Sequence, residues 1–448
     1  MDGNELAARF VRSTRWDALP DVVRHKIKLC LIDVVAATIG GVLAPVSDIA
    51  AGYASEAWRG NEATILLHDR RASAAGAAFA NACAANALDC DDGAVYTRGH
   101  VGAQVFPTAL AVAEKMGSSG SAMLAAMVAG YEIAHRVGRC WHRHQPIYQA
   151  DGSWGSVACA ATAAHLMGLD EERIKHALGI AEYFAPNVPM ERDLVNPAMV
   201  KHGHGWGAMT GVVAAELAER GFTGVPSLLG FEEYRDWVAT LGDEYVLVDG
   251  VDFKRYCSCG WTHTAIAAID KLRREHVWDV DDIEAIRLEG HHWTAVLHTA
   301  HPSTTEEAQF SARWVLAAYL VDGEVGPDQI LEARLGDTRI NALVDKIELV
   351  ESEELDDLYR PAFEGYGDGI SASRVVMRLR DGVVLDSGVV SDACRIPARG
   401  DEARLEQKFR WLTGYVLEER RITSLLEMLW HFDELQDVGE FAAYLQRR

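Results

Sequence analysis

The sequence predicts a mainly α protein in which a large all-helical domain is interrupted by a smaller inserted α+β lid domain. Apolar residues recur at helical spacing through about the first 270 residues, alternate as in strands between about 282 and 380, and return to helical spacing after 402. The 448 residues suffice for two domains or three. We place the helical domain at residues 1–268, its completion at 397–448, and the lid domain at 269–396.

The expected helices of the first part are recognised by their ends. Asp21 follows a proline and is a good N-cap, and Gly40-Gly41 ends the apolar pattern that follows it. The segment 74–88 consists almost entirely of small residues, which predicts a helix buried on all sides. Further helices are expected at 121–136, 155–167, 171–183 and 207–220, where Gly168 and Gly221 suit C-terminal positions.

The expected strands lie in the inserted part. Residues 282–288, 344–350 and 375–380 alternate between apolar and polar side chains. Asp381-Gly382 is a strong signal for a hairpin turn after the last of these runs. The apolar run 314–320 predicts a helix inside the lid, and helical spacing returns from Glu402 to the end. The C-terminal helices are therefore expected to pack on the N-terminal ones.

Composition and charge restrict the function. The 66 acidic and 43 basic side chains give a net charge of −23, which repels nucleic acid and disfavours an anionic membrane surface. An anionic substrate needs a local cluster of Lys, Arg and His. No segment reaches the roughly 20 apolar residues of a membrane span, and the N-terminus does not resemble a signal peptide. Several of the eight cysteines stand in apolar helical segments, which predicts buried free thiols and a cytoplasmic protein.

The densest group of polar residues lies between residues 86 and 108. Three carboxylates, Asp89, Asp91 and Asp92, end the small-residue helix, and a loop with Arg98 and His100 follows. Carboxylates beside an imidazole set its tautomer and raise its pKa, which suits proton transfer. The alternative is an acidic helix end followed by a solvated loop with one structural histidine.

Two more groups carry candidate chemistry. Lys201 and His204 lie in a glycine-rich stretch before a helix, where they could bind an anion or supply a base; the alternative is a polar turn. Lys254 precedes Cys257, Cys259 and His263, which lack the second ligand pair of a zinc site, so we predict no metal. No phosphate-binding loop, serine-hydrolase motif or dinucleotide fingerprint is present, and we expect no cofactor.

The order of the motifs along the chain resembles that of the MmgE/PrpD family, which includes 2-methylcitrate dehydratase, cis-aconitate decarboxylase and iminodisuccinate epimerase. The matching motifs include Leu88-Asp89-Cys90-Asp91-Asp92, His100-Val101-Gly102, Gly152-Ser153-Trp154-Gly155, Lys201 with His204, Lys254-Arg255-Tyr256 and Lys408-Phe409. The resemblance extends from about residue 5 to the C-terminus. It implies a homodimer, no metal or organic cofactor, and a pocket between the two domains.

Family pocket positions fall on Asp89, His100, Lys201, Lys254 and the neighbourhood of His263. The chain also departs from the family pattern. Gln149, beside Tyr148, stands where a histidine is usual, and Trp314 stands where a tyrosine is usual. Gly93 and Cys259 stand where the resemblance to the decarboxylase would place a threonine and a histidine. These departures disfavour decarboxylation.

Together these observations predict a cofactor-independent enzyme that abstracts a proton alpha to a carboxylate of a small di- or tricarboxylic acid. We favour a hydro-lyase similar to 2-methylcitrate dehydratase; the alternative is an epimerase of an imino- or amino-dicarboxylate, and a decarboxylase or a non-catalytic binding protein is less favoured. The predicted catalytic residues are His100, Lys201, Tyr148 and Asp89, the first three being alternative bases. The predicted substrate-binding residues are Asp92, Arg98, Gln149, His204, Lys254, Cys259 and His263.

Overall fold

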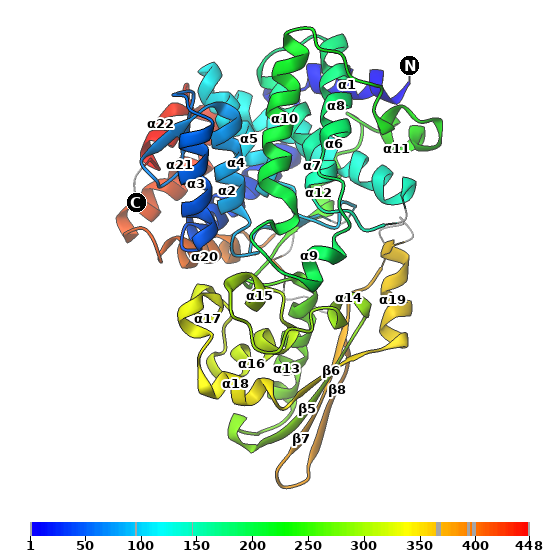
Figure 1. The fold of residues 1–448 in the computed structure, drawn as a ribbon, viewed down its shortest axis with the longest axis vertical. Coiled ribbons are helices and arrows are strands. Elements are labelled where there is room, and N and C mark those ends of the chain that lie inside the picture. Colours follow the sequence, from blue (N-terminus) through cyan, green and yellow to red (C-terminus); the bar gives the residue numbers. More distant parts are fainter. Residues whose placement is uncertain are drawn as a thin grey trace.

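The computed structural model describes residues 2–94, 96–145, 147–363, 369–391, 395–396 and 400–446. A large helical part stands above a smaller part that contains the main sheet (Figure 1). The first part contains α1 (Gly3–Ser13), α2 (Asp21–Gly41), α3 (Pro45–Ala57), α4 (Ala74–Ala85), α5 (Gly102–Met116), α6 (Gly120–His144), α7 (Gly152–Leu166), α8 (Glu171–Phe184), α9 (Glu191–Val195), α10 (His204–Glu219), α11 (Arg235–Ala239) and α12 (Leu247–Gly250). The predicted mainly helical fold is confirmed.

Small side chains let the central helices approach one another closely. Helix α7 packs against α6, α8 and α10, and α4 packs against α5 and α10. A Cβ added at Gly211 of α10 would lie 2.7 Å from the backbone nitrogen of Ala160 in α7. The predicted small-residue helix is mostly buried, but it ends at Ala85, and residues 86–89 form a turn. Helix α2 ends at Gly41, as predicted.

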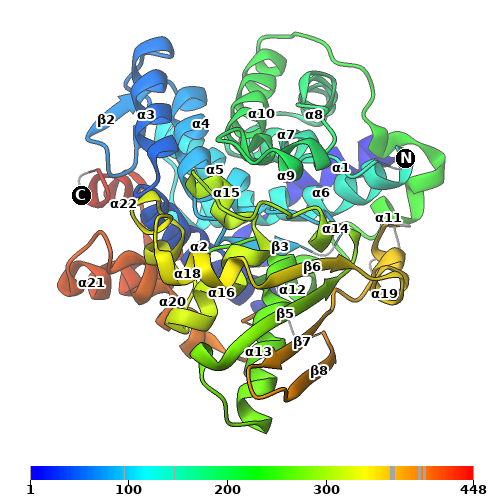
Figure 2. The same ribbon diagram turned by 60° about the horizontal axis from the view of Figure 1, so that its bottom comes forward.

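The second part is built around a four-stranded sheet in the order β6-β5-β7-β8. Strand β5 (Ile283–Gly290) pairs in parallel with β6 (Ile347–Glu351) and antiparallel with β7 (Ser373–Leu379), which pairs antiparallel with β8 (Val384–Val390). Gly382 has φ +89° in the predicted hairpin. Helix α13 (His263–Glu275) packs on β7 and β8 (Figure 2). The remaining helices are α14 (His292–Ala295), α15 (Thr305–Gln309), α16 (Ala312–Asp322), α17 (Pro327–Ile330), α18 (Thr338–Val344) and α19 (Glu353–Phe363).

The chain then returns to the helical part. Helices α20 (Glu402–Thr413) and α21 (Glu419–Trp430) pack on α2, and α22 (Gly439–Tyr444) packs on α5, so the predicted return of the C-terminus is confirmed.

The domain boundaries at 268 and 396 stay predictions. Helix α13 spans the first of them and packs on β7 and β8. No single helix among the described residues is long and apolar enough to cross a membrane, although α2 and α3, bent by 92°, meet the length and composition criteria as a pair.

Two short sheets complete the fold. Strand β1 (Ala63–Ile65) pairs with β2 (Arg70–Ala72), and β3 (Asp92–Ala94) pairs antiparallel with β4 (Val251–Phe253). The second pair joins the acidic loop after α4 to the segment that carries Lys254. Two groups of polar residues that lie about 160 positions apart in the sequence are thereby brought together.

Candidate active site

A cavity of about 380 Å³ lies where the acidic loop, the β4 segment and the sheet-containing part meet. Its wall combines residues from both parts of the molecule. They are Asp89, Gly93, Ala94, Arg98, Gly99, His100, Tyr148, Met190, Leu194, His202, Asp249, Gly250, Asp252, Lys254, Cys259, Gly260, Trp261, Phe310, Tyr359, Gly369, Ser371 and Arg395. Of the predicted site residues, Asp89, Arg98, His100, Tyr148, Lys254 and Cys259 belong to this wall.

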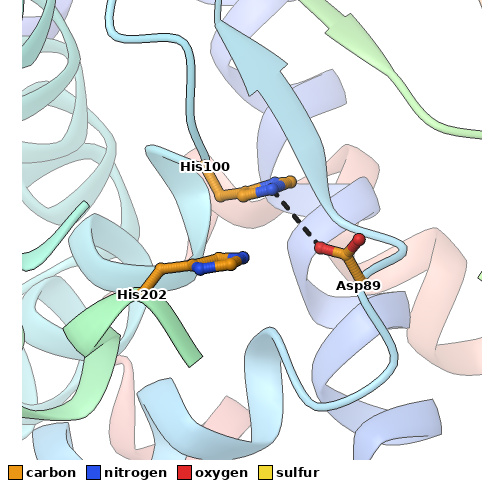
Figure 3. Close-up of side chains that lie close together, drawn as sticks. All are labelled: Asp89, His100 and His202. Carbon is orange, nitrogen blue, oxygen red and sulfur yellow. Dashed lines mark ion pairs between the residues drawn. The ribbon is translucent and has the colours of Figure 1, made fainter. Parts of the chain in front are cut away.

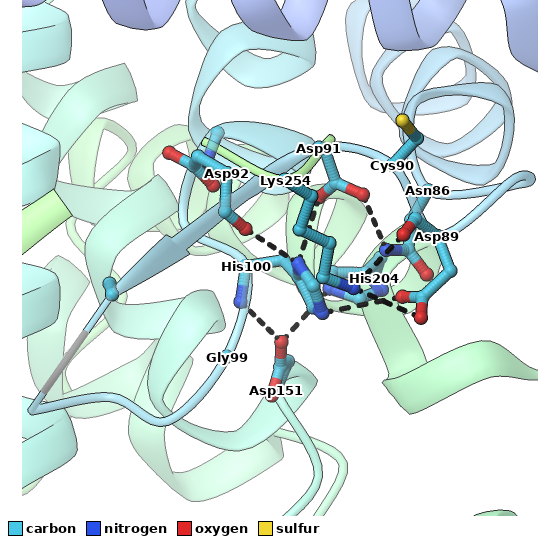
Figure 4. A network of polar contacts seen from close by, with 12 residues as sticks. Asn86, Asp89, Cys90, Asp91, Asp92, Gly99, His100, Asp151, His204 and Lys254 are labelled. Atoms are coloured by element: carbon cyan, nitrogen blue, oxygen red, sulfur yellow. Dashed lines mark hydrogen bonds and ion pairs between the residues drawn. The ribbon is translucent and has the colours of Figure 1, made fainter. Parts of the chain in front are cut away.

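His100 is held by carboxylates on several sides (Figure 4). Its Nδ1 lies 2.7 Å from the carbonyl oxygen of Asp92 and 3.3 Å from Oδ2 of Asp91, and its Nε2 lies 3.4 Å from Oδ1 of Asp89. Its backbone N–H donates to Asp151. Burial lowers the pKa of His100, but the charges of Asp91 and Asp89 outweigh burial, and the net shift of the pKa is upward. This imidazole is therefore poised to carry a proton near neutral pH.

Asp92 supports the site from behind the wall. Its carboxylate accepts hydrogen bonds from the Tyr131 hydroxyl (2.7 Å) and the Gly102 N–H (3.1 Å) at the start of α5. Burial and the neighbouring Asp91 raise the pKa of Asp92 to about 6. Its side chain is thus committed to positioning the loop that carries His100, and among the described residues it does not belong to the cavity wall.

Lys254 is paired with Asp89. Its Nζ lies 3.0 Å from Oδ2 of Asp89 and donates to the Asp89 carbonyl oxygen at 2.9 Å. Burial raises the pKa of Asp89, but the cationic groups of Lys254, Lys201 and His100 outweigh burial and hold the pKa far below its usual value. Asp89 is consequently a fixed negative charge between cations, and it serves to orient them.

Lys201 is not among the described residues that form the cavity wall. Its Nζ donates to the carbonyl oxygen of Asn86 and to Oε1 of Gln309, both at 2.6 Å, and lies 5.5 Å from the ring centre of Phe310. Burial lowers the pKa of Lys201 although Asp89 counteracts it. In this arrangement Lys201 supports the loop and the charge of Asp89, with Phe310 between it and the cavity.

His202 lines the cavity and was not among the predicted site residues. Its ring is stacked on that of His100, with centroids 6.1 Å apart and an interplanar angle of 7°. Its Nδ1 lies 2.8 Å from Oδ2 of Asp193, which leaves Nε2 for the cavity side. The sequence signal for this residue is the Lys-His-Gly-His stretch, in which only Lys201 and His204 are predicted as site residues.

His204 has a structural position. Its Nδ1 lies 2.9 Å from the carbonyl oxygen of Lys201, and its Nε2 lies 3.1 Å from Oδ2 of Asp151. Asp151 also accepts the hydrogen bond from the His100 backbone N–H. His204 therefore ties the lysine loop to the histidine loop, and among the described residues it is not part of the cavity wall.

The backbone is strained at three residues of the wall. Asp89, Arg98 and His202 have φ values of +52°, +54° and +58°, a region that residues other than glycine rarely adopt. Two other non-glycine residues among those described share this feature, Leu67 and Asp69. Such strain persists only where the surroundings enforce it, and it is concentrated at functional sites. Its position here agrees with the cavity being the active site.

The remaining predicted residues divide between the wall and the core. The Tyr148 hydroxyl donates to the Arg98 carbonyl oxygen, and burial raises its pKa well above the usual value, so it is poorly suited to be a base. Burial also raises the pKa of Cys259 to about 12, which keeps the thiol neutral. Gln149 bonds to Gln145, and the buried ring of His263 packs on Tyr256; neither belongs to the described wall.

Several cationic side chains gather in the wall of this cavity, beside the carboxylates of Asp89, Asp249 and Asp252. Arg98, Lys254 and Arg395 lie in its wall together with His100. Arg395 was not predicted from the sequence; it forms an ion pair with Asp252 and comes from the segment after β8. In a chain of net charge −23, this concentration of cations suits a small anion with more than one carboxylate.

Asp89, His100 and His202 form the one group among the described residues whose arrangement would fit a metal ion, with ligand atoms within 4.8 Å of one another (Figure 3). The Lys254 ammonium group, 3.0 Å from Asp89, already neutralises the only carboxylate of the group. We therefore expect activity to persist after dialysis against a chelator, measured with metal content by mass spectrometry. Loss of activity that returns on adding a divalent metal would contradict this prediction.

Two family models together match most of the chain. The family model for the MmgE/PrpD N-terminal domain matches residues 5–244, and that for the MmgE/PrpD C-terminal domain matches residues 256–431. The chain is 25% identical to the cis-aconitate decarboxylase-like protein oryM of Aspergillus oryzae, over 99% of this chain and 98% of the relative. It is 23% identical to the cis-aconitate decarboxylase of Aspergillus terreus (94% and 91% covered) and 25% identical to the human cis-aconitate decarboxylase (99% and 94% covered).

Proposed function

Because the chain belongs to the MmgE/PrpD family, we propose that it is a carboxylic-acid lyase, and specifically a hydro-lyase that removes water from a small hydroxylated di- or tricarboxylic acid. The observation that carries the proposal is the adjacent pair His100 and His202, each in contact with a carboxylate, in a cavity whose wall also holds Arg98, Lys254 and Arg395. Elimination of water needs a base for the proton and an acid for the hydroxyl. When the proton and the hydroxyl leave from the same face of the substrate, the base and the acid lie near that face.

The two imidazoles have different surroundings, and we assign their roles accordingly. His202 removes the proton from the carbon next to a carboxylate, as expected of an imidazole whose Nδ1 is held by Asp193. The electron pair is first delocalised into that carboxylate, and in a second step it forms the carbon–carbon double bond as the bond to the neighbouring hydroxyl breaks. His100, cationic because of its raised pKa, donates a proton to the departing oxygen, which leaves as water. Arg98 binds a substrate carboxylate, and the Lys254 ammonium group, which is paired with Asp89, adds a hydrogen-bond donor to it.

This arrangement favours dehydration over epimerisation. An epimerase that exchanges a proton between two faces needs proton-transfer groups on opposite sides of the reacting carbon. We place both imidazoles on one side of the reacting carbon, because their ring centroids lie 6.1 Å apart and their planes are nearly parallel. Decarboxylation is the second candidate, because the curated relatives named above are cis-aconitate decarboxylases or resemble one. In that reaction the bond to the carboxylate breaks, and His100 would donate its proton to the carbon that carbon dioxide leaves.

A product assay tests the proposal. The enzyme is incubated with a panel of hydroxylated and unsaturated di- and tricarboxylates, and ultraviolet absorbance, carbon dioxide release and optical rotation are followed together. A hydro-lyase forms a conjugated alkene from a hydroxy acid without carbon dioxide. Release of carbon dioxide from an unsaturated acid supports the second candidate, and a change in optical rotation alone contradicts both.

The raised pKa of His100 predicts the pH dependence of turnover. Since His100 donates its proton as a cation, turnover should fall as the pH rises through its pKa, which lies above the usual 6.5. The measurement is kcat across the pH range, with a thermal melt at each pH to exclude unfolding. A kcat that keeps rising through the alkaline range would show that His100 does not act as the donor.

A further inference from the structure

Arg395 reaches the cavity from the segment that leads back from the sheet to the helical part. Its neighbour Ile396 is fixed on β4, since the Ile396 N–H donates to the Phe253 carbonyl oxygen at 2.9 Å and the Phe253 N–H donates to the Ile396 carbonyl oxygen at 3.2 Å. Side chains alternate along extended backbone, so Arg395 and Asp252 project to the same side, where they form an ion pair. Asp252 is paired in register with Gly93 of β3.

The guanidinium group of Arg395 fits into a slot between two glycines. A Cβ at Gly93 would overlap Nη1 of Arg395, and a Cβ at Gly260 would lie 2.8 Å from its Nη2. Real Cβ atoms essentially never lie within 3.0 Å of another heavy atom, so a side chain at either glycine would make the guanidinium group shift, which the end of a flexible side chain can do at little cost to the fold. Neither glycine has a positive φ angle, and the backbone alone therefore does not explain them. The slot accounts for both residues.

We propose that Arg395 binds a second carboxylate of the substrate, and that Gly93 admits it to the cavity, which makes the enzyme selective for polycarboxylates over monocarboxylates. This inference rests on the proposed function, because it concerns the substrate of the same site. A guanidinium group has five N–H donors, more than the Asp252 carboxylate occupies, and its planar fork suits carboxylate recognition. In this proposal the carboxylate next to the reacting carbon binds to Arg98 and Lys254, which lie in the same wall.

A double-mutant cycle tests the inference by binding alone. The dissociation constants of succinate and of the monocarboxylate butyrate are measured by calorimetry for wild type, Arg395→Met, Gly93→Ala and the double variant. We expect Arg395→Met to weaken succinate binding about 10- to 100-fold, as for a lost hydrogen bond between charged groups, and to leave butyrate nearly unchanged. Gly93→Ala should weaken succinate binding similarly in the wild-type background and add little in the Arg395→Met background.

The control is Gly336→Ala, where an added Cβ meets nothing within 4 Å. Independent effects of the Gly93 and Arg395 variants, or equal losses for both ligands, overturn the inference. If Gly93→Ala does not fold, the ratio of the succinate and butyrate dissociation constants in Arg395→Met tests the inference. An unchanged ratio overturns it. Lyase activity on polycarboxylates with no selectivity change in Arg395→Met refutes this inference and leaves the proposed function standing. Absence of both carboxylate binding and lyase activity in the wild type refutes both.

Discussion

Replacing His100 by asparagine is expected to lower kcat by about 10²- to 10⁴-fold, the usual contribution of a general acid or base. Asparagine can still donate a hydrogen bond toward the Asp92 carbonyl oxygen, but it cannot deliver a proton at neutral pH. The loss should therefore appear in kcat more than in KM, because the substrate carboxylates still meet Arg98 and Lys254. Steady-state kinetics with the substrate found in the product assay measure it.

A matched control is His301→Asn, which removes an exposed imidazole that contacts Asn341 and Asp345 in the sheet-containing part. This variant should keep the wild-type kcat. Equal thermal melts for the two variants would exclude misfolding as the cause. A His100→Asn enzyme that turns over like the His301→Asn control would contradict the assigned role.

Lys408→Met is expected to lower the free energy of unfolding by about 3–5 kcal/mol, the usual cost of removing one partner of a buried ion pair. Lys408 Nζ lies 2.5 Å from Oδ1 of Asp33 in α2 and also donates to the Cys90 carbonyl oxygen. Burial raises the pKa of Asp33 to about 7 even with Lys408 beside it. Without the lysine, this carboxyl group is left without its partner in the core. Urea denaturation followed by circular dichroism measures the change.

The double variant Asp33→Asn with Lys408→Met separates the charge from the packing. It removes both charges, so it should recover part of the stability lost in Lys408→Met. If the two substitutions act independently, the free energy of unfolding of the double variant falls below that of Lys408→Met by the whole effect of Asp33→Asn alone. That result would show that the two residues do not act as a pair.

Much of the fold could be predicted because local patterns and tertiary structure agree. The end of α2 at Gly41, the small-residue helix α4 and the Asp381-Gly382 hairpin all depend on neighbouring residues in the sequence. The β3–β4 pair could not be predicted in this way. It joins three-residue strands about 160 positions apart, and such short segments carry no periodic signal of their own.

The site was predicted only in part for a similar reason. Asp89 and His100 stand in one conspicuous loop, and the structure brings Lys254 to them. The sequence does not predict His202, because it cannot tell which of the three polar residues in Lys201-His202-Gly203-His204 faces a cavity; in the structure His202 lies in the wall and has φ +58°. Arg395 had no local signal at all, since its role depends on the space left by Gly93 and Gly260.

The division of labour between the two histidines is tested most directly by proton exchange in heavy water. The incorporation of deuterium next to the substrate carboxylate is followed by nuclear magnetic resonance in His202→Asn and His100→Asn, and asparagine tolerates the positive φ angle of residue 202. The account predicts that His202→Asn loses exchange and elimination together, while His100→Asn keeps exchange but loses elimination. Exchange at the wild-type rate in His202→Asn would contradict it. So would elimination at the wild-type rate in both variants.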